Sequence, residues 1–350
     1  IQKVTDEAVK ITFEIPSSLQ DKFKFKQGQY LNLKFNFGEE EFRRSYSIID
    51  APSENSQTLS ILVKQMENGT ISTFLNQNLK ENDEVEVQQP MGNFCTNYHA
   101  SNHKNYVGIA AGSGISPVLS NLKEALFQEP NAKVLLFFGN KDSQNILLKE
   151  ELDALKERFP ERFQVTHVLS REPQEDALFE GRITTEKLGQ LLDKNFEIKP
   201  EDSTFFICGP TEMIKSTSDF LKKERKVPAL QVLYEYFSAP DDEDNAEMSE
   251  EFKKIPNLES FVTLIIDDDE YSIHLNSKKE SILDKALKEN LPVPFACKGG
   301  VCCTCKAQVM EGEVFMEKNF ALTEDEVARG FVLTCQCHPT TNIVMLNYDV

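Results

Sequence analysis

The chain has 350 residues, enough for two or three domains, and its 40% hydrophobic content is ordinary for a globular protein. Its 57 acidic and 38 basic residues give a net charge of −19, which argues against nucleic-acid backbones and anionic membrane surfaces as partners. Because no apolar run approaches the ~20 residues of a membrane span and no secretory signal pattern opens the chain, we expect a soluble, cytoplasmic protein.

The first hundred residues have the pattern of antiparallel β structure. Residues 9–15 and 31–37 alternate apolar with polar side chains, and glycines and prolines punctuate the runs. Many short strands with such turns predict a barrel or a sandwich, which we place at residues 1–102. A short helix is expected after Gly69, with Thr70 as its cap.

Strand and helix patterns alternate in the next part of the chain. Apolar runs at 106–110, 134–138, 163–169 and 204–208 are separated by stretches with helical spacing, such as 118–126 and 148–159. This alternation predicts a parallel sheet with helices on both faces, over residues 103–238.

Residues 239–256 are dominated by acidic side chains and contain little to bury. We interpret them as a flexible, self-repelling linker, with a solvated helix face as the alternative. From 257 to 350, a hairpin pattern at 261–275 precedes a helix that Ser281 can cap, and Thr323 with Glu326 has capping-box spacing.

Six of the eight cysteines lie in the last fifth of the chain. Cys297, Cys302 and Cys305 give a C-x₄-C-x₂-C pattern, and Cys335 follows far downstream, which is the plant-type spacing of a [2Fe–2S] cluster. A structural zinc site is the competing interpretation, but such sites usually pair two C-x₂-C knuckles and the second is absent. Cys303 and Cys337 fall outside this spacing, and their default role is packing.

Two segments of the first domain suit a flavin nucleotide. Arg44-Ser45-Tyr46-Ser47 supplies a cation and an aromatic face, although four such residues alone could be structural. The segment Gly69-Thr70-Ile71-Ser72 opens the short helix, whose exposed N–H groups make an anion site.

Two segments of the second domain lie where open α/β sheets bind ligands. Gly112-Ser113-Gly114-Ile115-Ser116-Pro117 joins a strand to a helix and permits a pyrophosphate, but a plain strand-to-helix turn is equally compatible. Cys208-Gly209-Pro210 ends a later strand, and a buried small hydrophobe is the alternative role of Cys208.

Taken in this order, the motifs resemble the ferredoxin–NADP reductase superfamily fused to a C-terminal plant-type ferredoxin, over essentially the whole chain. Within it, the sequence is similar to the reductase subunits of ring-1,2-phenylacetyl-CoA epoxidase complexes, most densely at residues 280–284 and 296–302. The resemblance implies an FAD-binding β-barrel, an NAD(P)-binding α/β domain and a β-grasp [2Fe–2S] domain.

The resemblance also implies a role for each matching residue. Arg44 would neutralise the FAD pyrophosphate, Tyr46 would stack on the isoalloxazine, and Ser47 would hydrogen-bond near flavin N5. The remaining cofactor-binding positions are Gly69, Ile71 and Ser72 for the FAD phosphates, Gly112, Gly114 and Pro117 for the dinucleotide phosphates, and Cys208, Gly209, Pro210, Met213, Glu235 and Phe237 beside nicotinamide and flavin. Tyr46, Ser47 and Cys208 would be catalytic, and Cys297, Cys302, Cys305 and Cys335 would bind the cluster.

Ser170-Arg171 falls where NADP-using relatives hold the 2′-phosphate, so NADPH is favoured over NADH, although Lys141 stands where many relatives have Arg. The implied activity is electron transfer from NADPH through FAD and the cluster to an oxygenase, expected to be a di-iron phenylacetyl-CoA epoxidase complex. A Rieske or steroid-hydroxylating oxygenase as client, or a non-catalytic redox-sensing metal module, are the alternatives.

Overall fold

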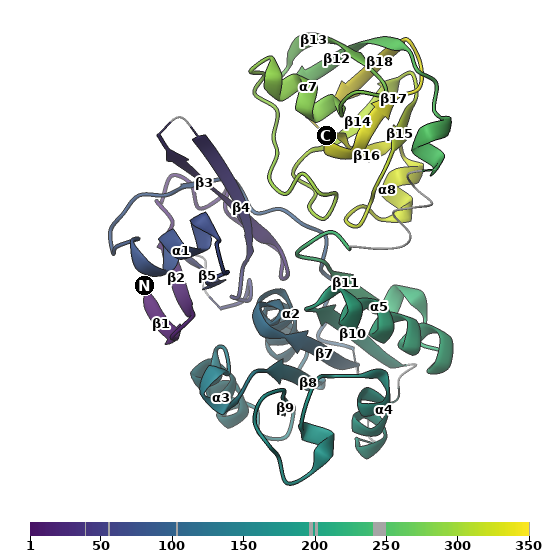
Figure 1. Cartoon of the computed structure of the whole chain (residues 1–350). Helices are drawn as coiled ribbons and strands as arrows, with labels where there is room; N and C mark the ends of the chain where they lie inside the picture. Colours follow the sequence, from purple (N-terminus) through teal and green to yellow (C-terminus); the bar gives the residue numbers. More distant parts are fainter. Residues whose placement is uncertain are drawn as a thin grey trace. The chain divides into compact units, whose positions relative to one another are not determined.

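The computed structural model describes residues 1–38, 40–54, 57–102, 104–195, 199, 202–240 and 250–349. The chain divides into two compact units (Figure 1). The first unit comprises residues 1–42 and 46–237, and the second comprises residues 43–45 and 238–350. The finer boundaries expected at 102, 238 and 256 stay predictions.

Antiparallel strands in two three-stranded sheets form the N-terminal part of the first unit, as the alternating pattern predicts. One sheet has the order β1-β2-β5 and the other β4-β3-β6. Their shared core contains Ile11, Leu31, Leu33 and Ile61. The elements are β1 (Gln2–Thr5), β2 (Ala8–Glu14), β3 (Tyr30–Phe37), β4 (Glu40–Ser47), β5 (Thr58–Lys64), α1 (Thr70–Gln77) and β6 (Glu86–Val87).

The start of α1 differs from the expectation. Gly69, not Thr70, is the N-cap, and Thr70 is already the first helical residue. The turn closes through Ser72 instead, whose hydroxyl accepts from the Met66 N–H at 3.0 Å and donates to the Gly69 carbonyl at 3.3 Å. Thr70 as a cap is therefore wrong.

A five-stranded parallel sheet of order β11-β10-β7-β8-β9 forms the rest of the first unit. Side chains of α2 and α3 share one core cluster with one face of this sheet, and side chains of α4 and α5 share a second cluster with the other face. The elements are β7 (Asn105–Ala111), α2 (Ile115–Gln128), β8 (Lys133–Asn140), α3 (Lys149–Arg158), β9 (Phe163–Leu169), α4 (Thr185–Lys194), β10 (Ser203–Cys208), α5 (Thr211–Asp219) and β11 (Val232–Glu235).

Helix α2 is buried on all sides, whereas its spacing predicts one buried face. Every residue from Ile115 to Leu126 is buried. The reason is that the β-strand part of the unit covers the far side of the helix. Ser120 Oγ donates to the Asp50 carbonyl at 2.6 Å, and Asn121 Nδ2 donates to the Phe94 carbonyl at 2.9 Å.

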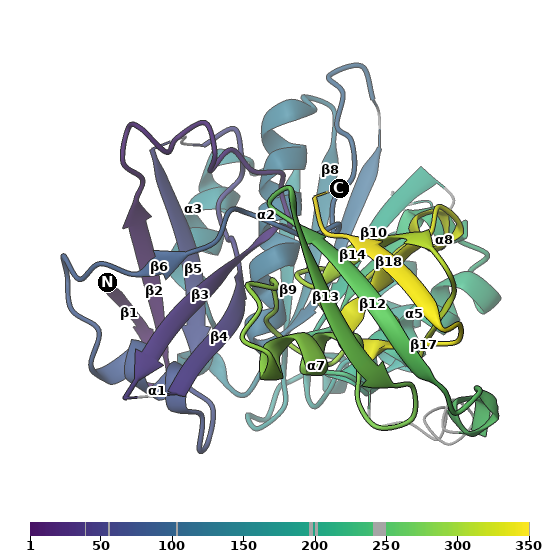
Figure 2. The same cartoon turned by 90° about the horizontal axis from the view of Figure 1, so that it is seen from above.

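The second unit contains a five-stranded sheet of order β13-β12-β18-β14-β16 and a separate β15-β17 pair. Figure 2 shows β13, β12 and β18 side by side. Ser281 caps α7, and Thr323 and Glu326 form the expected capping box of α8. The elements are β12 (Glu259–Ile266), β13 (Asp269–Asn276), α7 (Ile282–Lys288), β14 (Lys306–Glu311), β15 (Val314–Met316), α8 (Glu324–Ala328), β16 (Phe331–Leu333), β17 (Cys337–Pro339) and β18 (Ile343–Asn347).

Part of the expected linker is helical. Residues 241–249 lie outside the described residues, but 250–254 form a short helix. Its Phe252 ring packs on the His338 ring with 4.6 Å between centroids, and Lys278 Nζ donates to the Phe252 carbonyl at 2.5 Å. This end of the expected linker therefore packs against other residues of the second unit, and the linker bounds 239–256 stay a prediction.

Candidate functional site

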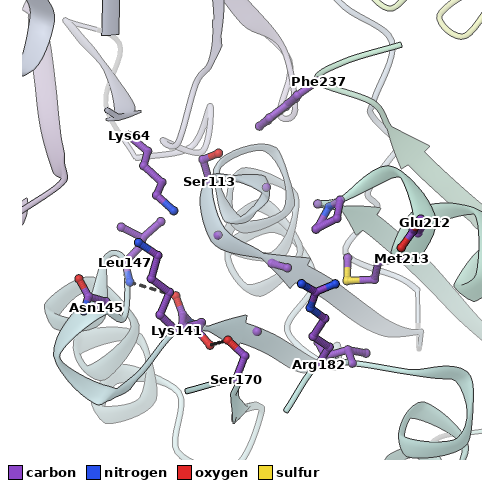
Figure 3. A pocket seen from close by; sticks show the side chains of 18 of the residues that line it. Lys64, Ser113, Lys141, Asn145, Leu147, Ser170, Arg182, Glu212, Met213 and Phe237 are labelled. Carbon is purple, nitrogen blue, oxygen red and sulfur yellow. Dashed lines mark hydrogen bonds between the residues drawn. The ribbon is translucent and has the colours of Figure 1, made fainter. Parts of the chain in front are cut away.

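A cavity of about 700 Å³ lies in the first unit at the carboxyl ends of the parallel strands (Figure 3). Residues that follow all five strands line it. They are Gly112 and Gly114 after β7, Lys141 after β8, Ser170 after β9, Gly209 and Pro210 after β10, and Phe237 after β11. Ligands of open α/β sheets bind at this edge.

The glycine turn after β7 lets the chain approach both its neighbour and a ligand. A Cβ on Gly114 would lie 2.3 Å from the Cys208 carbonyl oxygen, so only glycine lets this turn pack on the end of β10. Gly112 has φ +55°, and a Cβ there would meet nothing within 4 Å. The turn thus presents open backbone to the cavity, which suits a pyrophosphate. Pro117 lies in the first turn of α2, buried and outside the cavity lining.

An apolar corner of the cavity is formed by the residues expected beside nicotinamide. Gly209, Pro210, Met213 and Phe237 all line it, and Phe237 is 47% exposed although it is a large aromatic residue. An exposed aromatic face beside a cavity suits a planar ring as ligand. Cys208 lies just behind this lining and is fully buried.

Ser47, Cys208 and Glu235 come together from three strands. Cys208 and Glu235 are register partners in β10 and β11, and Ser47 Oγ donates to Glu235 Oε2 at 3.4 Å. Burial raises the pKa of Glu235 to about 8, and burial also raises the pKa of the Cys208 thiol. Both groups therefore keep their protons at neutral pH, and the set can hold a proton next to the apolar corner.

The residues expected around the flavin lie on β4 and at the start of α1. Tyr46 packs against the strand core, and the Arg44 guanidinium donates to the Arg43 carbonyl at 2.7 Å. Ile71 and Ser72 turn their side chains inward, so their contribution to a phosphate site would be their backbone N–H groups. A shallow hollow lined by Gly69, Thr70 and Phe74 lies at this helix start.

The cavity also contains basic residues that sequence reasoning missed. Ser170 lines it as expected, whereas Arg171 does not. Lys64, at the end of β5, and Arg182 line it together with Lys141 (Figure 3). No local pattern marks Lys64 or Arg182, because each reaches the cavity only through the packing of its element. Next to Arg182, Gly181 marks a turn in the sequence, and its φ of +90° is one that favours glycine.

The four cysteines of the expected cluster lie together in the second unit as two pairs. Cys302 Sγ donates to Cys297 Sγ at 3.0 Å, and the thiols of Cys305 and Cys335 are hydrogen-bonded to each other. Among the described residues, no three His, Cys, Asp or Glu side chains converge on a point as ligands of one ion. Two pairs of thiols fit two irons, each taking two sulfur ligands, better than one tetrahedral zinc.

Polar donors around these sulfur atoms fit thiolate ligands. The hydrogen bond between the two thiols lowers the pKa of Cys297 and raises that of Cys302, whereas the Gly299 N–H, which donates to Cys297 Sγ at 3.4 Å, is a backbone donor that favours the thiolate. Gln336, to which sequence reasoning gave no role, donates to Cys335 Sγ at 3.6 Å and to the Lys298 carbonyl at 3.0 Å. It thereby ties the fourth cysteine to the loop of the first three.

The two extra cysteines of this region lie in its apolar core. Cys303 and Cys337 are buried, and both belong to the core cluster of the second unit. The Cys303 thiol donates to the Ala321 carbonyl at 3.6 Å.

Three family models match the chain in the order of these sites. The oxidoreductase FAD-binding domain matches residues 1–96, the oxidoreductase NAD-binding domain residues 109–219, and the 2Fe-2S iron-sulfur cluster binding domain residues 264–340.

Known proteins are similar to this chain over nearly its full length. The chain is 37% identical to a subunit of the 1,2-phenylacetyl-CoA epoxidase of Escherichia coli (strain K12), covering 100% of this chain and 96% of that protein. It is 28% identical to the 3-ketosteroid-9-alpha-monooxygenase ferredoxin reductase component of Rhodococcus rhodochrous, covering 97% and 92%. The solved structure of phthalate dioxygenase reductase shares the fold, with a TM-score of 0.57 at 21% identity over 99% of this chain and 95% of that one.

The chain belongs to the ferredoxin–NADP reductase superfamily, in the branch that carries a C-terminal [2Fe–2S] ferredoxin domain. It is an oxidoreductase with FAD-, NAD(P)- and [2Fe–2S]-binding domains. The expected fold class, an antiparallel FAD barrel, a parallel-sheet nucleotide domain and a ferredoxin domain, is confirmed. In the described part of the chain, no helix is both long and apolar enough to cross a membrane.

Proposed function

We propose that this protein is the reductase component of an oxygenase system, that NADPH is its electron donor, and that its client is a di-iron phenylacetyl-CoA epoxidase. The observation that carries the proposal is the full-length similarity to the Escherichia coli epoxidase subunit, which runs across both units and both candidate sites. The bound cofactors supply the redox chemistry, namely hydride transfer from nicotinamide to flavin and single-electron transfer through the cluster.

The protein's own residues would bind and orient these groups. Gly112 and Gly114 would offer backbone to the dinucleotide phosphates, and Met213 and Phe237 would form an apolar wall beside the nicotinamide. Ser47 and the protonated Glu235 hold a hydrogen-bonded proton beside that wall. Arg44 and Tyr46 would hold the flavin, and Cys297, Cys302, Cys305 and Cys335 would bind the two irons. We place the chain in the cytoplasm, because a cysteine cluster with iron-ligand spacing in a long chain is typical of a reducing compartment.

The preference for NADPH is supported by the basic residues around Ser170. Ser170 lines the cavity, and the Arg171 N–H donates to the Lys141 carbonyl at 2.7 Å, which holds these two basic residues together. Changing Arg171 to Ala should raise the KM for NADPH about three- to tenfold and leave that for NADH nearly unchanged, because only NADPH carries the extra phosphate. Steady-state reduction of ferricyanide measures both, and an unchanged ratio would remove this support.

The client is tested by reconstitution. Purified epoxidase should consume phenylacetyl-CoA with NADPH when this chain is added and should not when it is replaced by the Cys302→Ser variant. A steroid-hydroxylating oxygenase is the second candidate client, because the Rhodococcus relative is named for one, and it is assayed in parallel. Epoxidation no faster with the chain than without it would contradict the proposed client. A colourless protein holding zinc would support the non-catalytic metal module.

A further inference from the structure

A cluster of basic residues at one end of the cavity already holds an acidic side chain. Lys141 Nζ pairs with Glu7 Oε2 at 2.7 Å, joining the end of β8 to the turn between β1 and β2. Lys64, Lys141, Glu7 and Ser170 all line the cavity, and Figure 3 shows Lys64 and Lys141 at the same end of it. The pair is partly accessible, with the two side chains 32% and 48% exposed.

The charges in this cluster are unbalanced. Lys141 lowers the pKa of Glu7, chiefly through their hydrogen bond, and the charges of Lys64 and Arg171 act in the same direction. Burial lowers the pKa of Lys64, and repulsion from Lys141 and Arg171 adds to this. Lys64 and Lys141 line the cavity beside a single carboxylate, and the charge of Arg171 acts on that carboxylate from outside the lining. This excess of positive charge favours a more highly charged anion such as a phosphate monoester.

A buried polar group beside the cluster lacks a partner. Asn140 lines the cavity and is 7% exposed, and its Nδ2 has no hydrogen-bond partner among the described residues. Its Oδ1 accepts from the Leu147 N–H at 3.5 Å, so the amide is oriented with its donor unpaired. Because unpaired buried donors are costly, this group is suited to donate to an oxygen of a bound ligand.

We propose that Glu7 is a specificity-determining residue that competes with the 2′-phosphate of NADP(H) for Lys141. The carboxylate neutralises Lys141 in the free protein, and a phosphorylated nucleotide must displace it and bear its repulsion. NAD(H) has no such phosphate and is indifferent to Glu7. Glu7 thus weakens the preference for NADPH over NADH that the basic residues create. This inference rests on the proposed function, in which the cavity binds the dinucleotide.

The test compares nucleotide affinities of Glu7→Gln and wild-type protein, both full-length and loaded with FAD. Titration calorimetry with NADP⁺ and NAD⁺ gives the affinities, and 2′,5′-ADP and 5′-AMP repeat the comparison without the nicotinamide. Glu7→Gln should tighten NADP⁺ and 2′,5′-ADP about three- to tenfold and leave NAD⁺ and 5′-AMP unchanged. Asp6→Asn is the matched control, because Asp6 is the neighbouring exposed acid and pairs with Lys3.

A second variant tests whether the effect of Glu7 requires Lys141 or is electrostatic repulsion between Glu7 and the nucleotide alone. In a Lys141→Gln background, Glu7→Gln should tighten NADP⁺ by a clearly smaller factor, because the group they compete for is gone. No tightening by Glu7→Gln, equal tightening of NADP⁺ and NAD⁺, or the same effect in both backgrounds would overturn the inference alone. Wild-type protein that binds none of the four nucleotides would overturn the proposed function and this inference with it.

Discussion

Among the individual residues, the surroundings of each cysteine and each carboxyl group determine whether it can bind iron or keep its proton. Cys302 and Cys303 are adjacent and both buried, yet only Cys302 lies against a second expected ligand, Cys297. Backbone and amide N–H groups donate to the sulfur atoms of Cys297 and Cys335, whereas the Cys303 thiol is itself a donor, to the Ala321 carbonyl. Neighbouring residues of the same type thus have different roles.

Changing Cys302 to Ser should remove the [2Fe–2S] absorption and the reduction of cytochrome c while leaving NADPH-dependent ferricyanide reduction, because the flavin would still be reduced. Cys303→Ser is the matched control and should keep the iron. Visible spectra and both steady-state rates provide the measurement. Equal loss of both activities in Cys302→Ser would contradict the order of electron transfer.

Glu235 should make the stability of the FAD-free protein depend on pH. Burial raises its pKa to about 8 from the ordinary 4.5, so the folded state holds a proton that the unfolded state releases between these values. The stability that Glu235 contributes to the folded state is fully present below pH 4.5 and is lost as the pH rises through 8. Relative to wild type, Glu235→Gln should therefore gain stability from pH 5 to pH 8 and then level off. Urea unfolding followed by circular dichroism measures this, with exposed Glu224→Gln as the control; a difference independent of pH would refute it.

Helices α8 and α1 both have a threonine at their start, but their first turns are closed by different hydrogen bonds. In α8 the Thr323 hydroxyl accepts from the Glu326 N–H at 3.2 Å, and the Glu326 carboxylate accepts from the Thr323 N–H at 3.0 Å. Helix α1 has no side-chain cap, because its closing hydrogen bonds come from Ser72. The threonines at these two helix starts, Thr70 and Thr323, therefore have different roles.

Thr323→Ala should cost about 1 kcal/mol, the usual value of an N-cap, and should lower the hydrogen-exchange protection of the Glu326 amide about fivefold. Thr70→Ala, at the first helical position of α1, should change the protection of that helix far less. Native-state hydrogen exchange resolves both helices in one experiment. A comparable loss in α1 would mean that Thr70 caps it after all.

At the scale of the whole molecule, a buried ionic network joins the strand part of the first unit to its α/β part. Lys123 of α2 is 2% exposed and pairs with Glu54 at 3.0 Å and with Glu151 of α3. Lys10 of β2 reaches Glu151 at 3.2 Å. Ion pairs therefore join the strand part of the first unit to its α/β part. Removing one member of a pair would destabilise the fold, because a buried charge without its partner is costly in free energy.

Lys123→Met should destabilise the first unit by about 3–5 kcal/mol, because it leaves two carboxylates without their buried partner. Burial opposes the ionised form of Glu151, but Lys123 and Lys10 outweigh it and lower its pKa. The stability that ionised Glu151 contributes through this network is thus present above pH 4.5. It is lost as the pH falls through the pKa of Glu151 in the folded state, which is lower than 4.5. Lys149→Met, which breaks an exposed pair with Asp153, should cost about 0.5 kcal/mol or less. Urea unfolding at pH 7 and pH 4 measures both, and equal costs for the two variants would contradict the network's role.

The kinds of element, their order and the four cysteines expected to bind iron are all visible in the amino-acid sequence. Period-two alternation, the strand–helix repeat and C-x₄-C-x₂-C are local patterns, so they need only neighbouring residues to be visible. Ser281 and Thr323 were found as caps for the same reason.

Which residues share a site depends on how distant parts of the chain pack together. Cys208 and Glu235 meet through strand register, whereas Ser47 reaches Glu235 from a strand of another sheet. Lys64 and Glu7 reach the cavity because the strand part packs on the parallel sheet. The burial of α2 on all sides depends on the same packing. Such contacts join residues far apart in the chain, and no local spacing records them.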